Sequence, residues 1–246
     1  MTNSTPIEFK RSAVEPVECL KQGWNLIKDQ YWLFVGMSFV GLLIANFVPF
    51  GILLGPMMCG IYLGLFRMQR KQPVQFGDLF KGFDYFGESI IATLFHMVPI
   101  ILILGTFYIA ILLGMFLVLP SSGDRSDPTG VIIFFSILTL GGIVMMLAIV
   151  MLSILFAFAY PLIVDRRLSG IEAVKLSAKA GMANFGRLFG LLLLNGALSF
   201  VGLLLCYVGI FLVLPLSFAA MSVAYQQVFG LGEVQPAGPP PPPIFT

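Results

Sequence analysis

Residues Phe158–Ser177 read FAYPLIVDRRLSGIEAVKLS. An apolar run ends at Val164, and three charged residues, DRR at 165–167, follow it directly. Ser169 and Glu172 then have the Ser-x-x-Glu spacing of a capping box, which begins a helix. The stretch therefore predicts a membrane span that ends in an aqueous layer, then a turn, and then an amphipathic helix that leads to the next span.

The composition also indicates a membrane environment for the whole chain. Of the 246 residues, 58% are hydrophobic and 11% are charged, whereas soluble domains have about 25% charged residues. The composition predicts an all-α, polytopic transmembrane helical bundle. Basic residues are spread over several loops, which gives no support for a nucleic-acid partner. Four blocks without a charged residue each exceed the roughly 20 residues that cross a hydrocarbon core: Tyr31–Phe66, Ser89–Gly123, Pro128–Val164 and Leu188–Gly232.

These blocks divide into six predicted spans. Turn residues at 49–51 split the first block, and residues 206–209 split the last. The two middle blocks have no turn signal at their centres, so each is predicted as one long helix that is tilted, kinked or protruding, with Pro99 as a kink. A single membrane domain, residues 13–230, would contain spans at about 31–48, 51–68, 89–119, 130–164, 187–205 and 209–229.

Three amphipathic helices are expected to lie in the cytoplasmic membrane interface, at about 16–29, 76–87 and 170–184. The phenylalanine stripe of the second is expected to face lipid or neighbouring helices, with a specific lipid or ligand site as the alternative. The predicted apolar faces are Val17, Leu20, Trp24 and Ile27 in the first helix, Phe76, Leu79, Phe80, Phe83 and Phe86 in the second, and Ile171, Val174 and Ala178 in the third.

The basic residues predict the orientation. With six spans, every Lys and Arg except Arg125 falls on one side, so both termini are expected in the cytoplasm. Residues 1–30 lack the apolar core of a signal peptide, which leaves the first span as the insertion signal. Residues 1–12 are predicted to be disordered. The proline-rich tail, 231–246, is predicted to be a flexible spacer, or else a ligand for a proline-reading domain.

An internal repeat relates the two ends of the chain. The sequence VECLK at 17–21 resembles IEAVK at 171–175, and residues 51–56 resemble 209–215. Each copy has an interfacial helix followed by two spans, and both copies begin and end on the cytoplasmic side. The pattern predicts a weak parallel repeat, unlike the inverted repeats of many transporters.

Several motifs resemble a known family. They are YPLIVDR at 160–166 followed by EAxxxS at 172–177, FGDLF at 76–80, and Pro215 with a later Ala-Tyr at 224–225. The chain resembles a family of uncharacterised bacterial polytopic inner-membrane proteins, similar to the membrane domain of glycerophosphodiester phosphodiesterases, without the catalytic domain. The resemblance implies a bacterial inner-membrane location and supplies no activity.

Two sets of polar residues are candidate sites. Asp165, Arg166, Arg167, Ser169 and Glu172 are expected to form a structural ion-pair and capping network, or, as the alternative, a site where the arginines contact anionic lipid headgroups. A second set, which would line a narrow path or form interhelical hydrogen bonds, has Asn46, His96, Tyr160 and Asn195 as its main members, with Thr93, Thr106, Ser136, Ser153 and Ser199.

The sequence offers little for catalysis. Within the predicted spans His96 is the one ionisable group, although buried charges usually mark transport and proton relays. No cluster with metal-ligand spacing is present, no cofactor is expected, and Cys19, Cys59 and Cys206 are predicted to be free thiols. We therefore expect a non-enzymatic scaffold or accessory protein that contacts membrane lipids and another membrane protein. The alternative is a transporter or channel-like protein for a lipid or a small uncharged solute.

Overall fold

The computed structural model describes residues 8–47, 51–118, 129–204 and 208–232. Every regular element in these ranges is helical, so the predicted all-α class is confirmed for them. The predicted breaks at 49–50 and 206, the loop with Arg125, and the tail from residue 233 lie outside the described residues. The elements are α1 (Pro16–Ile27), η1 (Lys28–Gln30), α2 (Tyr31–Phe47), α3 (Leu54–Gln69), η3 (Phe76–Tyr85), α4 (Phe86–Val118), α5 (Thr129–Phe156), α6 (Ala159–Arg166), α7 (Gly170–Ala183), α8 (Phe185–Leu204) and α9 (Val208–Phe229).

Five segments of the described chain are long and apolar enough to cross a membrane, which makes this a multi-pass membrane protein. The predicted span at 51–68 is not among them. It corresponds to α3, which has 16 residues and is therefore about 24 Å long, shorter than the roughly 30 Å hydrocarbon core. The five segments are Pro16–Phe47, Phe76–Phe116, Thr129–Arg166, Phe185–Leu204 and Gly209–Phe229.

Helix α3 lies at the centre of the fold, in contact with α2, η3, α4, α6 and α9. Its glycines allow this burial because they let other backbones approach closely. A β-carbon on Gly60 would lie 2.0 Å from the carbonyl oxygen of Leu79 in η3, and one on Gly55 would lie 2.7 Å from that of Ser89 in α4. The helix is therefore surrounded by protein where an isolated span would meet lipid.

The segment predicted as an amphipathic α-helix at 76–87 is instead the 3₁₀-helix η3. Its start is capped, because the backbone N–H of Gln75 donates to Oδ2 of Asp78 at 3.0 Å. Leu79 is fully buried, whereas the phenylalanine stripe is exposed, with Phe80 at 46%. A 3₁₀-helix is narrower than an α-helix, which suits the backbone contact with α3 at Gly82.

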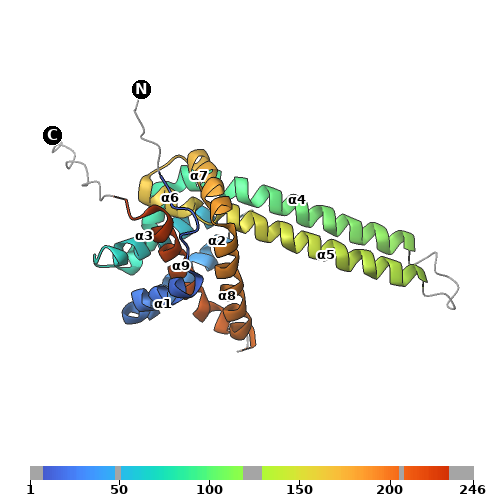
Figure 1. Ribbon diagram of the computed structural model, residues 1–246, viewed down its shortest axis with the longest axis horizontal. Coiled ribbons are helices and arrows are strands. Elements are labelled where there is room, and N and C mark those ends of the chain that lie inside the picture. The colour runs from blue at the N-terminus through green and yellow to red at the C-terminus, as the bar shows by residue number, and fades with distance from the viewer. Residues whose placement is uncertain (1–7, 48–50, 119–128, 205–207, 233–246) are drawn as a thin grey trace, which may run out of the picture.

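Helices α4 and α5 form a hairpin that extends away from the other helices (Figure 1). Helix α4 has 33 residues, about 50 Å, and Pro99 lies inside it without ending it. The two helices meet closely at Gly114, where a β-carbon would lie 2.2 Å from the ring of Phe134. Large apolar side chains are exposed on both helices, including Leu102 at 64% and Leu140 at 65%.

The predicted helix at 130–164 is not continuous, because α5 ends at Phe156 and α6 begins at Ala159. The hydroxyl of Ser177 in α7 produces the break. It donates to the carbonyl of Leu155 at 2.7 Å and accepts from the backbone N–H of Phe158 at 3.1 Å. A side chain that takes these backbone partners interrupts a helix, so the chain turns here before the charged corner.

The amphipathic helices α1 and α7 pack against the rest of the protein largely through small residues, and part of each predicted apolar face stays exposed. In α1, Val17 and Trp24 are 56% and 46% exposed, while Cys19, Gly23 and Ile27 are buried. A β-carbon on Gly23 would lie 2.8 Å from the backbone nitrogen of Ala220, so α1 packs directly on α9. In α7, Ile171 is exposed and the buried face consists of small residues, namely Gly170, Ala173, Ser177, Ala180 and Gly181.

Both ends of the described chain lie at the same end of the protein (Figure 1). The backbone N–H of Lys10 donates to the carbonyl of Val228 at 2.9 Å, although residues 1–12 were expected to be disordered. Asn184, at the end of α7, accepts from the backbone N–H of Ala13 at 2.9 Å and donates to the Lys10 carbonyl at 3.1 Å. These contacts hold the segment before α1 against α9 and α7.

Candidate functional site

The carboxylate of Asp165, near the end of α6, is fully buried and joins three helix ends. Its Oδ1 atom accepts a hydrogen bond from Nη2 of Arg70 at 2.5 Å. Its Oδ2 atom accepts one from the hydroxyl of Tyr225 at 2.8 Å and one from the backbone N–H of Gly232 at 2.9 Å. A buried carboxylate needs such partners to remain charged, so Asp165 fixes the ends of α3, α6 and α9 relative to one another.

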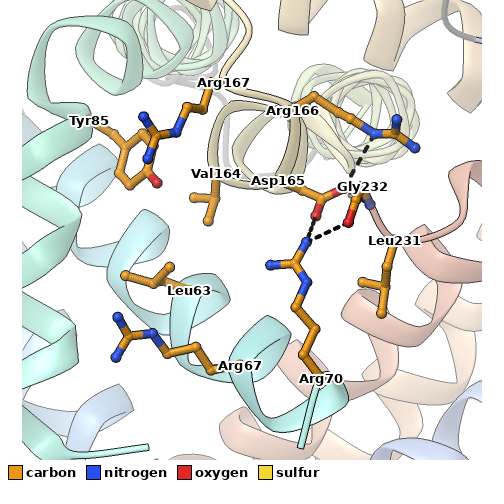
Figure 2. A pocket seen from close by; sticks show the side chains of 10 residues that line it. All are labelled: Leu63, Arg67, Arg70, Tyr85, Val164, Asp165, Arg166, Arg167, Leu231 and Gly232. Atoms are coloured by element: carbon orange, nitrogen blue, oxygen red, sulfur yellow. Dashed lines mark hydrogen bonds and ion pairs between the residues drawn. The ribbon is translucent and has the colours of Figure 1, made fainter. Parts of the chain in front are cut away.

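Arg70 and Arg166 also hold carbonyl groups at the end of α9 and just after it, and Figure 2 shows the contact of Arg70 with Gly232. Arg70 donates to the carbonyl of Gly232 at 3.0 Å, and Arg166 donates to that of Phe229 at 3.1 Å. Nε of Arg166 forms an ion pair with Oδ2 of Asp165 at 3.4 Å. Cations are favourable at the C-terminal end of a helix, where carbonyl groups lack helical partners. Asp165 and Arg166 therefore belong to one ion-pair network.

Ser169 and Glu172 lie outside that network, at the start of α7. The hydroxyl of Ser169 accepts from the backbone N–H of Glu172 at 3.4 Å and donates to its carboxylate at 2.9 Å. Glu88 of α4 accepts from the backbone N–H of Gly170 at 2.5 Å. Carboxylates near a helix N-terminus stabilise it. The predicted corner thus separates into an ion-pair network and a capped helix start.

A second buried carboxylate, Asp78, joins η3 to the end of α3. Its side chain is 2% exposed, and Oδ1 lies 2.6 Å from Nη1 of Arg67 and 2.7 Å from Nζ of Lys81. Both cations are more exposed than the carboxylate, at 28% and 51%. The arrangement directs the Arg67 side chain along the surface between α3 and η3.

A cleft of about 550 Å³ opens beside the Asp165 network, and four of its ten lining residues are arginines. We call it the arginine cleft. Figure 2 shows Arg67 and Arg167 on two sides of the cleft, with the Arg70–Asp165 pair on a third. One carboxylate faces four guanidinium groups, so the lining carries a formal charge of +3. The lining residues are Leu63, Arg67, Arg70, Tyr85, Val164, Asp165, Arg166, Arg167, Leu231 and Gly232.

Arg167 lies between the arginine cleft and a neighbouring cleft of about 510 Å³. Its backbone has φ of +50°, the left-handed conformation that ends α6, and its guanidinium lies beside the hydroxyl of Tyr85. The neighbouring cleft also contains Asp84 and Glu88. Arg67, Arg70 and Arg166 each have a carboxylate within 4 Å, whereas the described residues supply none to Arg167.

The four main residues of the candidate polar path lie on four different helices, and no member of the path set lines either cleft. Asn46 is exposed and donates to the carbonyl of Leu42 at 2.8 Å. The hydroxyls of Tyr160 and Thr93 are buried and 3.0 Å apart. The ring of His96 stacks on that of Phe156, with centroids 4.9 Å apart. Asn195 lies on α8, and a path through these residues stays a prediction.

The smaller hydroxyl residues of the path mostly bond within their own helices. Thr106 donates to the carbonyl of Leu102 at 2.7 Å, and Ser136 donates to that of Ile132 at 2.8 Å. Ser153 does the same with the carbonyl four residues earlier. Such bonds satisfy a hydroxyl in an apolar environment without a partner helix, and they need no interhelical contact.

Most partners of the cleft were not predicted from the sequence. Arg67 and Arg70 contributed only to the predicted orientation, and Tyr225 only to a motif. The signal that could have identified them is charge balance, since Arg67 directly follows an apolar block, as Asp165 does, and Arg70 comes three residues later. Within the described residues, no group of three His, Cys, Asp or Glu side chains could hold a metal ion.

No family model, curated protein or solved structure matches this chain. The resemblance to bacterial inner-membrane proteins therefore stays an expectation.

Proposed function

We propose that this protein is a non-enzymatic membrane scaffold or accessory protein that acts through helix packing and lipid contact. The observation that carries the proposal is the α4–α5 hairpin. The most apolar window of Phe76–Phe116 has no residue buried inside the protein. A continuous apolar surface of this kind marks a contact with lipid or with another protein. The hairpin can therefore contact lipid and helices of a partner at the same time.

We also infer the placement of the chain in a bacterial inner membrane, with both termini cytoplasmic. The arginines at the ends of α3 and α6 meet in one cleft, and the segments before α1 and after α9 lie at the same end. An excess of basic residues favours the cytoplasmic side. If the short helix α3 counts as a sixth crossing, the basic ends of α3 and α6 lie on the same side of the membrane. The parallel repeat stays a prediction within this proposal.

The experiment is photo-crosslinking in intact cells from single positions on the hairpin. We expect Leu102 on α4 and Ile137 on α5, both exposed by more than 60%, to yield defined adducts with another membrane protein. Lys175, exposed on the polar side of α7, is the control position. Adducts with lipid alone from both hairpin positions would contradict the scaffold proposal, as would turnover of a substrate by the purified protein.

A further inference from the structure

We propose that the arginine cleft binds the phosphate group of a phosphate ester, through Arg67 and Arg167 as the principal ligands. The proposal rests on the lipid contact in the proposed function and identifies the chemistry of one contact site. A phospholipid headgroup and a soluble phosphate ester offer the same group, and the experiment below distinguishes these two sources.

The charges of the cleft favour an anion. Its lining has four arginines and one aspartate. The nearby pair of Asp78 and Lys81 leaves that balance unchanged. The acidic residues Asp84 and Glu88 line the neighbouring cleft, which shares Tyr85 and Arg167 with the arginine cleft, and Glu88 is bonded to the start of α7. An anion that enters the arginine cleft therefore meets a positive surface.

Two of the four guanidinium groups are each bonded twice within the protein, and the other two keep hydrogen-bond donors for a ligand. Arg70 and Arg166 each bond to Asp165 and to a carbonyl near the end of α9. Arg67 bonds to Asp78 through Nη1, and a guanidinium has five N–H donors. Arg167 has no carboxylate within 4 Å among the residues that the structure describes. Arg67 and Arg167 thus retain donors that can reach a ligand.

Phosphate is the anion that this arrangement suits best. Planar guanidinium groups bind phosphate with paired hydrogen bonds, and a phosphate has enough oxygens to accept from two arginines at once. The rigid neighbours of the cleft, the Arg70–Asp165 pair and the Asp78 cap, hold the surface in place before binding. Such preorganisation reduces the entropic cost of binding.

The position of the cleft matches the phosphate layer of a membrane. Phe66 and Val164 are the last residues of two charge-free blocks, and Arg67 and Asp165 follow them directly. The cleft therefore lies where two apolar segments end, which is the level of lipid headgroups. Basic pockets between helices on the cytoplasmic side are typical sites for anionic headgroups.

The test measures lipid binding to the full chain in mild detergent by native mass spectrometry. The probes are phosphatidic acid, phosphatidylcholine and inorganic phosphate. We expect one tightly bound phosphatidic acid, whose affinity falls about tenfold or more in Arg67→Gln with Arg167→Gly, because two charge-assisted contacts are lost. Gly at 167 is compatible with the positive φ, and Lys81 remains as a partner for Asp78.

The control variant is Lys175→Gln with Lys179→Gln, which removes two charges from the exposed side of α7 and is expected to leave the affinity unchanged. If the double arginine variant does not fold, Arg167→Gly alone is used with the same comparison. Binding of phosphatidic acid that inorganic phosphate does not displace identifies a lipid headgroup as the source. Binding of inorganic phosphate alone, with the same loss in the arginine variant, identifies a soluble ester.

Equal binding of phosphatidic acid by the wild type and the arginine variant would overturn the proposal. A loss of affinity in the lysine control as large as that in the arginine variant would also overturn it. Neither result depends on a protein partner. Failure at the cleft can therefore be separated from failure of the scaffold function, which the hairpin crosslinks test independently.

Discussion

Gly82 of η3 lies against Pro56 of α3 so closely that a β-carbon on Gly82 would be 1.9 Å from the Pro56 carbonyl oxygen. We expect Gly82→Ala to lower the stability of the protein by about 2 kcal/mol or more, because the backbones must separate to admit a methyl group. Unfolding of the purified protein in mixed detergent micelles measures the change. Gly77→Ala is the control, since a β-carbon there meets nothing within 4 Å. Equal stability of the two variants would refute the backbone contact.

The pair Arg70–Asp165 predicts a strongly coupled double-mutant cycle. Asp165→Asn leaves the Arg70 guanidinium, 19% exposed, without its charged partner, and should cost about 3 kcal/mol of stability. In the Asp165→Asn background, Arg70→Gln should lower the stability much less than it does in the wild type, because the two residues share one network. Asp84→Asn, at an exposed position, is the matched control. Additive losses in the double variant would show that the two side chains act independently.

The contact between α1 and α9 predicts protection of a thiol. Cys19 is fully buried and its Sγ atom lies 3.2 Å from Oε1 of Gln227. In a Cys206→Ser background, Cys19 should react with maleimide slowly. We expect Gly23→Val to speed the reaction about tenfold or more, because the side chain cannot fit against Ala220.

Cys59 serves as the internal reference for this experiment, because it is also fully buried and lies in α3, outside the contact between α1 and α9. Gly196→Ala, at a site with open space, should leave the reaction of Cys19 unchanged. Fast labelling of Cys19 in the Cys206→Ser protein with Gly23 intact would place α1 away from α9 and contradict this contact.

The hairpin predicts that a single charge will impair membrane integration. Leu140 lies on the exposed surface of α5. A lysine at the centre of a membrane span raises the free energy of insertion by about 3 kcal/mol, which is the expected effect of Leu140→Lys. We expect the membrane-integrated fraction of the protein to fall severalfold in fractionated cells. Ile171→Lys, also exposed but on α7, should integrate normally. Full integration of the Leu140→Lys variant would mean that this face of α5 does not meet lipid.

The helices of the fold were largely predictable, because long apolar blocks must satisfy their backbones internally in a membrane. Pro16 begins α1, and the spacing of Ser169 and Glu172 marks the start of α7. The small residues through which both helices pack on their neighbours were not predicted. Hydrophobic periodicity favours large side chains such as Trp24, whereas close helix contact in a membrane favours small ones such as Gly23.

Only the part of the candidate site at the end of α6 was predictable from the sequence. There Asp165, Arg166 and Arg167 form a cluster of consecutive charged residues. Their partners could not be found, because Arg70 lies 95 residues away from Asp165 and periodicity carries no information about which helices adjoin. The 3₁₀ geometry of η3 was likewise not predicted, and it accompanies the close backbone contact of Gly82 with α3.

The central place of α3 has a consequence for biosynthesis. This helix is made early, yet its Phe66 ring packs against that of Tyr225 at 5.3 Å, and Gln69 donates to Ser222 at 3.1 Å. Both of these partners belong to α9, the last helix of the described residues. In the newly made protein, the short, glycine-rich helix α3 must therefore persist without these partners until α9 has been synthesised. A chain truncated before α9 would have an incomplete core.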